Sequence, residues 1–362
     1  MRFIHLSDVR LGLHSESGRR WSDERITEIS GSFRKTLDEA DRDGIDLVLI
    51  AGGLFAHRPV TTELDEANRI FASHPDMAFV VIAGESDILR KNSPVRSFRW
   101  APNVHYVLNE RPEKVNFPAL RTSVYAMSCS EATASAEELL AASESDLTDG
   151  STEYAKIALF VERDPEKASH MRYSGFTYAA LGGKASHSAL VEGKAYYSGG
   201  LEPEGMTDFG EHGYMKGEIV MPGKALKEIT FVPASSMSYV PLKVAVSVNT
   251  KGADLESLID GEIRRRGVSN IYRIRITGKK DPEADFSLSS LKEKYRIADI
   301  TDESEPQYDY ETIYEEHPDD MIGYFISTLR RNREELPDID KKAMFFGIDA
   351  LLKTAEGKEA DR

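Results

Sequence analysis

The sequence contains very little cysteine and no long apolar run. Cys129 is the only cysteine in 362 residues, which excludes an intramolecular disulfide and makes a reducing cytoplasm the simplest location. No stretch approaches the roughly 20 apolar residues that a membrane helix needs, and the start of the sequence lacks the apolar region of a signal peptide. We therefore expect a cytoplasmic protein that has no membrane association.

Positive charge is also scarce. The sequence has 61 Asp and Glu residues against 46 Lys and Arg, which gives a formal net charge of −15 at pH 7. This balance argues against a chain that coats nucleic acid by bulk electrostatics, although it is compatible with a local basic groove. We therefore expect weak or indirect DNA binding.

The order of the expected strands and helices divides the chain into three parts. Up to about residue 235, buried apolar strands at 2–6, 46–51 and 78–83 alternate with helical patterns at 23–42 and 61–73, which predicts parallel strands covered on both faces. Shorter strands follow, and two sheets packed together with helices outside fit this order. Residues 236–300 predict a small strand–helix–strand domain, and residues 301–362 predict an acidic linker followed by two helices.

Four short motifs within residues 1–235 carry the information about function. Three apolar runs each end in a turn where polar side chains could converge: Phe3-Ile4-His5-Leu6-Ser7-Asp8-Val9-Arg10, Leu47-Val48-Leu49-Ile50-Ala51-Gly52-Gly53, and Val80-Val81-Ile82-Ala83-Gly84-Glu85-Ser86-Asp87. A fourth motif, Ala180-Leu181-Gly182-Gly183-Lys184-Ala185, follows much later.

The order and spacing of these motifs resemble the calcineurin-like metallophosphoesterases, most closely the SbcD-type DNA-repair exonucleases. That family reads Asp-x-His, Gly-Asp-x-x-Asp, Gly-Asn-His-Asp, a lone His after a strand, and Gly-His-x-His. The resemblance implies a four-layer αββα sandwich with a small α/β capping domain and C-terminal helices. It also implies a site that, in the family, holds two Mn²⁺ or Mg²⁺ ions to activate water against a phosphodiester.

Most of the family's functional positions carry other residues in this sequence. The degenerate cleft implied by the resemblance consists of Asp8, Arg10, Gly53, Ala56, Glu85, Ser86, Asp87, Val161, Gly183 and Ala185, of which only Asp8 and Asp87 match the family. Arginine does not ligate metals, and glycine and alanine offer no ligand. We therefore expect no cofactor and no competent catalytic residue, and the chain leans toward a pseudoenzyme.

Two rebuilt versions of this cleft remain open. A single-metal site would use Asp8, Glu85 and His57, and a phosphate-binding site would use Arg10 and Lys184. Either would make the chain an active but divergent exonuclease or phosphoesterase. Because residues two apart at a strand end point the same way, Arg10 is expected beside Asp8, where it would supply positive charge in place of a metal.

The end of the chain carries a wide apolar stripe at helical spacing, formed by Met344, Phe345, Ile348, Leu351 and Leu352. In SbcD-type nucleases the C-terminal helices dock on the coiled coils of an SbcC-like ABC-class ATPase, so the resemblance implies that this stripe binds a partner. Packing of the stripe on its own domain is an equal alternative, and a homodimer is a further one. We therefore expect a catalytically degenerate SbcD-like subunit that assembles or regulates a DNA-processing complex.

Overall fold

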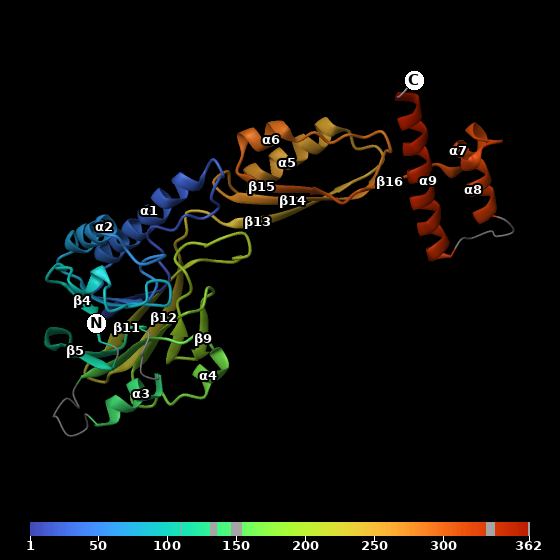
Figure 1. Cartoon of the computed structure of the whole chain (residues 1–362). Helices are drawn as coiled ribbons and strands as arrows, with labels where there is room; N and C mark the ends of the chain where they lie inside the picture. The colour runs from blue at the N-terminus through green and yellow to red at the C-terminus, as the bar shows by residue number, and fades with distance from the viewer. Residues whose placement is uncertain (110, 131–135, 146–153, 331–336, 361–362) are drawn as a thin grey trace. The chain divides into compact units, whose positions relative to one another are not determined.

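The computed structural model describes residues 1–109, 111–130, 136–145, 154–330 and 337–360 (Figure 1). The chain divides into two compact units. The first comprises Met1–Val240 with Ser269–Ile271, and the second comprises Pro241–Val268 with Tyr272–Arg362. In the described parts of the chain, no helix combines the length and the apolar character that a bilayer span requires.

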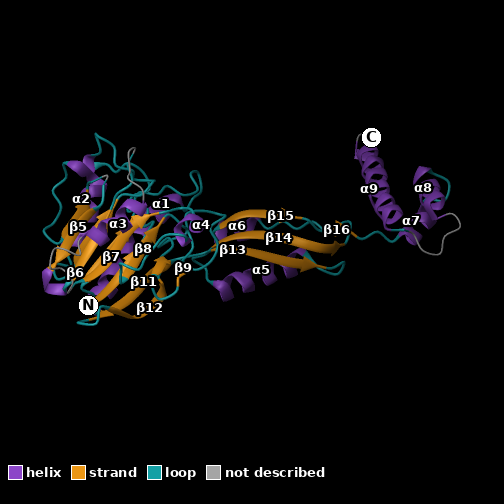
Figure 2. Ribbon diagram, turned by 90° about the horizontal axis from the view of Figure 1, so that it is seen from below, coloured by secondary structure: helices purple, strands orange, loops and turns teal. Residues whose placement is uncertain are grey.

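The first unit contains two six-stranded sheets (Figure 2). One sheet consists of β1 (Arg2–Leu6), β2 (Leu47–Ala51), β3 (Ala78–Ile82), β4 (Val104–Val107), β11 (Gly213–Val220) and β12 (Ala225–Pro233). Its strand order is β12-β11-β1-β2-β3-β4. Strands β1 to β4 are parallel, while β11 runs antiparallel to both β1 and β12.

The other sheet consists of β5 (Glu113–Phe117), β6 (Thr122–Ala126), β7 (Ala155–Val161), β8 (Tyr178–Gly182), β9 (Ser188–Val191) and β10 (Ala195–Tyr197). Its strand order is β5-β6-β7-β8-β10-β9. The four inner strands are parallel, and the edge strands β5 and β9 are antiparallel to their neighbours.

Helices cover the outer faces of both sheets. They are α1 (Ser22–Arg42), α2 (Thr61–Ala72), α3 (Ala136–Ser145) and α4 (Pro165–Ser169), with short 3-10 turns at Pro94–Arg96 and Pro118–Leu120. In α1, Phe33 and Leu37 lie four residues apart on one face and pack with Phe71 of α2 against the first sheet. Leu139 and Leu140 of α3 pack against the second sheet.

Apolar side chains from both sheets pack against each other between the sheets. Leu49 and Val80 of the first sheet belong to one buried cluster with Leu159 and Ala180 of the second. The order of layers is therefore helix, sheet, sheet, helix. This is the mixed α/β sandwich that the alternation of apolar strands and amphipathic helices predicts.

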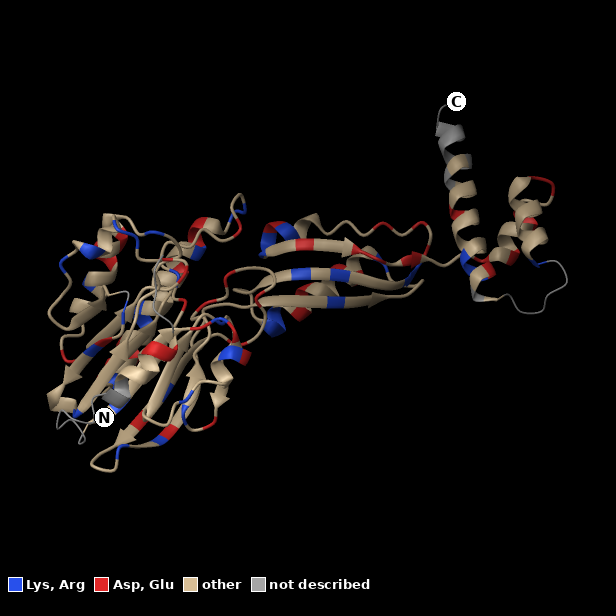
Figure 3. Ribbon diagram, turned by 60° about the horizontal axis from the view of Figure 1, so that its bottom comes forward, with Lys and Arg blue, Asp and Glu red and all other residues tan. Residues whose placement is uncertain are grey.

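The second unit begins with a small α/β module. Its elements are β13 (Tyr239–Val246), α5 (Gly252–Arg266), β14 (Ile271–Lys280), α6 (Ser289–Lys294), β15 (Ile297–Asp302) and β16 (Glu305–Pro306). Strands β14 and β15 are parallel. In β14, Ile274 and Ile276 are buried and alternate with the exposed Arg273 and Arg275. One face of this sheet is thus apolar and the other is charged. Figure 3 shows how Lys and Arg are distributed along the ribbon.

Three helices follow this module: α7 (Tyr310–Glu316), α8 (Met321–Arg330) and α9 (Asp338–Ala360). Met344 and Ile348 of α9 are completely buried and pack with Ile322 and Ile326 of α8. Of the two alternatives for the apolar stripe, Met344 and Ile348 follow the one in which it packs on the chain's own helices, and Phe345, Leu351 and Leu352 are partly buried around the same cluster.

Candidate functional site

The ends of five strands converge on one pocket of ≈ 770 Å³ in the first unit. The residues that line it from these strand ends are Asp8 and Arg10 after β1, Ala51 and Gly52 at β2, Gly84, Glu85 and Ser86 after β3, Val161 and Arg163 at β7, and Gly183 and Ala185 after β8. Carboxyl ends of parallel strands are where α/β folds gather ligand-binding groups. The fold therefore places seven of the ten cleft residues expected from the sequence in a single pocket lining.

A loop before β11 forms another wall of the pocket through Glu204, Gly205, Thr207 and Asp208. Asp208 holds this loop in place, because its Oδ2 accepts a hydrogen bond of 2.9 Å from the Glu204 amide and its Oδ1 lies 3.0 Å from His212 Nε2. The side chain of His212 is only 2% exposed. The loop wall is thus fixed by its own contacts.

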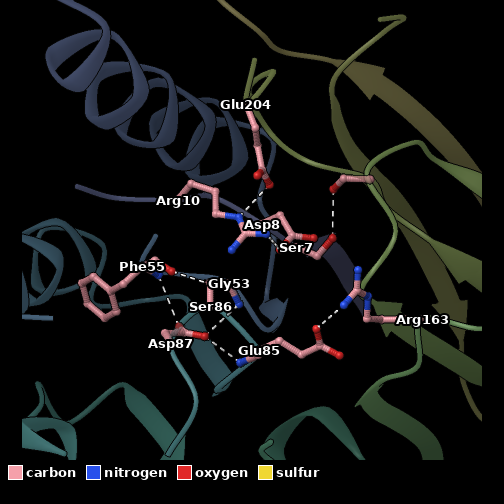
Figure 4. A network of polar contacts seen from close by, with 12 residues as sticks. Ser7, Asp8, Arg10, Gly53, Phe55, Glu85, Ser86, Asp87, Arg163 and Glu204 are labelled. Carbon is pink, nitrogen blue, oxygen red and sulfur yellow. Dashed lines mark hydrogen bonds and ion pairs between the residues drawn. The ribbon is translucent and has the colours of Figure 1, made fainter. Parts of the chain in front are cut away.

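Asp8 and Arg10 form an ion pair inside the pocket (Figure 4). Asp8 Oδ1 lies 3.1 Å from Arg10 Nη2, and Arg10 Nε donates to Glu204 Oε1 at 2.7 Å. This confirms the expectation that Arg10 points toward Asp8. Both residues have a left-handed backbone, with φ of 47° and 60°, a conformation that residues other than glycine rarely adopt and that often marks a functional site.

Burial dominates the acidity of Asp8. Removal from water raises the pKa of this carboxyl to about 7, although the charge of Arg10 lowers it. The neighbouring carboxylates Glu204, Asp87 and Glu85 also raise this pKa, and the value of about 7 is the net result of all these effects. Asp8 therefore exchanges a proton near neutral pH, and the single cation beside it does not fully compensate for burial.

Asp87, the other residue that matches the family pattern, lies beneath the pocket. It is 1% exposed, and its carboxylate accepts hydrogen bonds from the backbone amides of Gly84 at 2.6 Å, Gly53 at 3.2 Å and Phe55 at 3.3 Å. Burial raises the pKa of Asp87, while these hydrogen bonds lower it. Asp87 thus joins the turns after β2 and β3.

Gly53 lies against the Asp8 side chain. A Cβ at position 53 would be 2.3 Å from Asp8 Oδ1 and 2.9 Å from Asp8 Cα, and Gly53 has φ of +67°. The space that a side chain at position 53 would need is therefore filled by Asp8.

Gly183 shows a similar relationship with Arg163. Gly183 has φ of +97°, and a Cβ there would be 3.1 Å from Arg163 Cγ and 3.0 Å from Val161 Cγ1. Arg163 Nη1 then donates to Glu85 Oε2 at 2.7 Å. Arg163 is not among the residues predicted from the sequence, although one signal was present: it follows Val161 at a strand end by two residues, as Arg10 follows Asp8.

Lys184 and His57 lie apart from this arrangement. Lys184 Nζ donates to Ser188 Oγ at 3.0 Å and lies over the Tyr197 ring. Of the two phosphate-binding candidates, Arg10 lines the pocket and Lys184 does not, while Arg163 supplies a further guanidinium group to the lining. His57 Nε2 lies 3.3 Å from Glu63 Oε1 and is not part of the pocket lining.

Ala56 and Ser86 are the last two cleft residues expected from the sequence. Ala56 is also absent from the lining. Ser86 lines the pocket, but its hydroxyl donates to the Phe55 carbonyl at 2.8 Å.

The residues present do not fit a two-metal centre. Such a centre needs several carboxylate or imidazole ligands around each ion, whereas Gly53, Ala56, Gly183 and Ala185 offer none. A comparison with models of known protein families finds no match to this sequence.

Proposed function

We propose that this chain is a catalytically degenerate relative of the calcineurin-like metallophosphoesterases of the SbcD type, acting as a non-catalytic subunit. The two-sheet sandwich and the convergence of the motifs at one set of strand ends support this proposal. The single observation that carries it is the Asp8–Arg10 ion pair beside Gly53. An arginine and a carboxylate occupy the space in which that family would bind metals.

The physical argument concerns charge. A two-metal site places four positive charges among its ligands, and these charges stabilise the carboxylates as well as the transition state. Here Arg10 and Arg163 supply fixed positive charge instead, each paired with a carboxylate. Arginine can neutralise a carboxylate, but it cannot deliver a bound hydroxide at neutral pH. The arginines therefore neutralise carboxylates of the cleft, but they do not supply the groups that the reaction needs.

The proposed partner is an SbcC-like ABC-class ATPase with long coiled coils. The helices α8 and α9 form a small core of their own and leave large apolar side chains exposed, among them Met321, Tyr324 and Phe346 at 71%, 63% and 66%. Exposed apolar side chains on a helix pair are suited to docking on another helical surface. In this proposal the exposed residues contact the partner, while Met344 and Ile348 hold the helices together.

Co-purification with a co-expressed coiled-coil ATPase of this type tests the proposal. We expect the full chain to be retained, and Phe346→Asp or truncation after Leu336 to abolish retention. Val268→Asp is the matched control, because Val268 is 59% exposed in the α/β module. If the full chain is not retained, or if Phe346→Asp binds as well as Val268→Asp does, the proposed partner is wrong.

One observation favours a second candidate function, a divergent phosphoesterase that works without the family's metals. A carboxyl with a pKa of about 7 in an open pocket is what a general acid or base needs. This candidate predicts hydrolysis of phosphate esters that depends on Asp8 in the presence of a chelator. If Asp8→Asn and the native chain release phenolate from an activated ester at equal rates, the second candidate is excluded.

A further inference from the structure

The pocket contains two guanidinium groups, and each already holds a glutamate carboxylate (Figure 4). Arg163 Nη1 lies 2.7 Å from Glu85 Oε2, and Arg10 Nε lies 2.7 Å from Glu204 Oε1. The four residues come from four separate segments of the chain. The two carboxylates mark the places in the pocket where an oxyanion is accepted.

Both glutamates are more exposed than the buried carboxyl of the pocket. Glu85 and Glu204 are 52% and 37% exposed, whereas Asp8 is 13% exposed. Exposed ion pairs contribute little to stability, because both side chains must be ordered in a screened environment. Each pair also uses only part of the five N–H donors of its guanidinium group. An incoming anion can therefore replace either glutamate without unfolding the pocket.

We propose that this pocket binds an oxyanion, the phosphate or carboxylate group of a small ligand, on the Arg163 and Arg10 guanidinium groups in place of the Glu85 and Glu204 carboxylates. Guanidinium groups bind both oxyanions through paired hydrogen bonds. The site goes beyond the proposed subunit role and does not depend on it. A chain that binds no partner could still bind the anion, and the reverse also holds.

The charge balance of the pocket determines the conditions for binding. Asp8, Glu85, Glu204 and Asp208 line the pocket, with Asp87 beneath it, and they outnumber the two arginines. Two events reduce this excess of negative charge around the arginines: the two glutamates move away from them, and Asp8 binds a proton. The charged groups that face Asp8 are Arg10 on its own segment and Glu204, Asp87 and Glu85 on neighbouring segments. The anion therefore binds more tightly when Asp8 carries its proton. Sulfate is the probe for this pH dependence, because its own charge is constant near neutral pH.

Isothermal titration of the full chain at constant ionic strength tests the site, with inorganic phosphate, sulfate and malonate as probes. Arg163→Ala is expected to weaken binding about tenfold or more, since it removes a charge-assisted hydrogen bond. Arg172→Ala is the matched control, because Arg172 is exposed and absent from the pocket lining. Glu85→Ala, which removes the internal competitor, is expected to tighten binding by up to about fivefold.

The two variants are expected to change the affinity in opposite directions. Misfolding cannot explain both results, because an unfolded protein does not bind more tightly. Binding of phosphate and sulfate without malonate assigns a phosphate-type ligand, and binding of malonate alone assigns a carboxylate. The proposal is overturned if no probe binds, if Arg163→Ala binds as Arg172→Ala does, or if Glu85→Ala weakens binding. Sulfate that binds no more tightly at about pH 6 than at about pH 8 overturns the linkage to the Asp8 proton.

Discussion

The Asp8 carboxylate occupies the space that a side chain on Gly53 would need. A Cβ on Gly53 would come within 2.3 Å of Asp8 Oδ1, well inside contact distance. Asp8 in turn faces Arg10 at 3.1 Å. Positions 8 and 53 are thus sterically coupled, and any side chain introduced at position 53 would collide with Asp8.

The coupling predicts that Gly53→Ala destabilises the protein more than a matched glycine substitution does. Gly193 is the control, since its φ of +68° equals that of Gly53 within a degree and nothing lies within 4 Å of a Cβ there. Backbone strain costs both variants ~1–2 kcal/mol, and overpacking adds ~1–3 kcal/mol at position 53. Denaturant unfolding measures the difference, and equal free energies of unfolding for the two variants would show that Asp8 moves aside freely.

The pKa of Asp8 predicts a pH dependence of stability. Burial raises this pKa from 3.8 to about 7, so the folded state binds the proton more tightly than the unfolded chain does. The contribution to the free energy of unfolding is therefore full below the unfolded pKa and is lost as pH rises through the folded pKa. In the native chain the free energy of unfolding should fall by an amount on the order of 1–3 kcal/mol between about pH 5 and about pH 8. Asp8→Asn should abolish this fall.

Asp43→Asn is the control for that measurement. A hydrogen bond from Lys216 lowers the pKa of Asp43, so this exposed carboxyl titrates below the chosen range. Its variant should follow the native slope of stability against pH. Parallel curves for Asp8→Asn and the native chain would mean that Asp8 is ionised throughout.

A buried charge cluster joins α1 to the segments that flank β11 and β12. Glu202, 2% exposed, accepts hydrogen bonds from Arg25 at 3.1 Å, Ser32 at 2.5 Å and the Ser236 amide at 2.6 Å. Glu202→Gln should lower the free energy of unfolding by ~3–5 kcal/mol, because it leaves the fully buried Arg25 without its buried partner. Glu28→Gln, which alters the partly exposed partner of Arg25, should cost below ~1 kcal/mol. Similar melting temperatures for the two variants would contradict this ranking.

The C-terminal helices should be stabilised by their internal contacts. Ile348 is completely buried, whereas Phe346 two residues earlier is 66% exposed. Ile348→Ala should therefore cost the helices ~2–5 kcal/mol, and Phe346→Ala should change their stability by less than ~0.5 kcal/mol. Amide hydrogen exchange along α8 distinguishes the two. Equal protection in both variants would mean that α9 does not pack on α8 in solution.

The sequence predicts the buried strands well because burial on both faces leaves a continuous apolar run. The expected strand at 2–6 matches β1 in both bounds, and those at 46–51 and 78–83 match β2 and β3 to within one residue. Strand β5 was missed because, of its five residues Glu113–Phe117, only Val115 is buried. An edge strand of this kind carries too few apolar side chains to be distinguished from a loop.

The candidate site could be predicted only where one motif carries the information. Arg10 lies two residues from Asp8, so its direction follows from strand geometry. The pairing of Arg163 with Glu85 joins residues from different sheets, and no local pattern indicates it. The sequence left two alternatives open for the stripe on α9, because an apolar face predicts that something covers it but does not identify what does.

The most direct test of the central claim is hydrolysis of bis-p-nitrophenyl phosphate by the purified chain with Mn²⁺ or Mg²⁺. Loss of one charge-stabilising group typically slows an enzyme ~10²–10³-fold, and the proposed relationship implies that this chain lacks several such groups at once. We therefore expect the native chain to release p-nitrophenolate no faster than Asp8→Ala or buffer with the same metal. Turnover well above that background, abolished by Asp8→Ala, would contradict it.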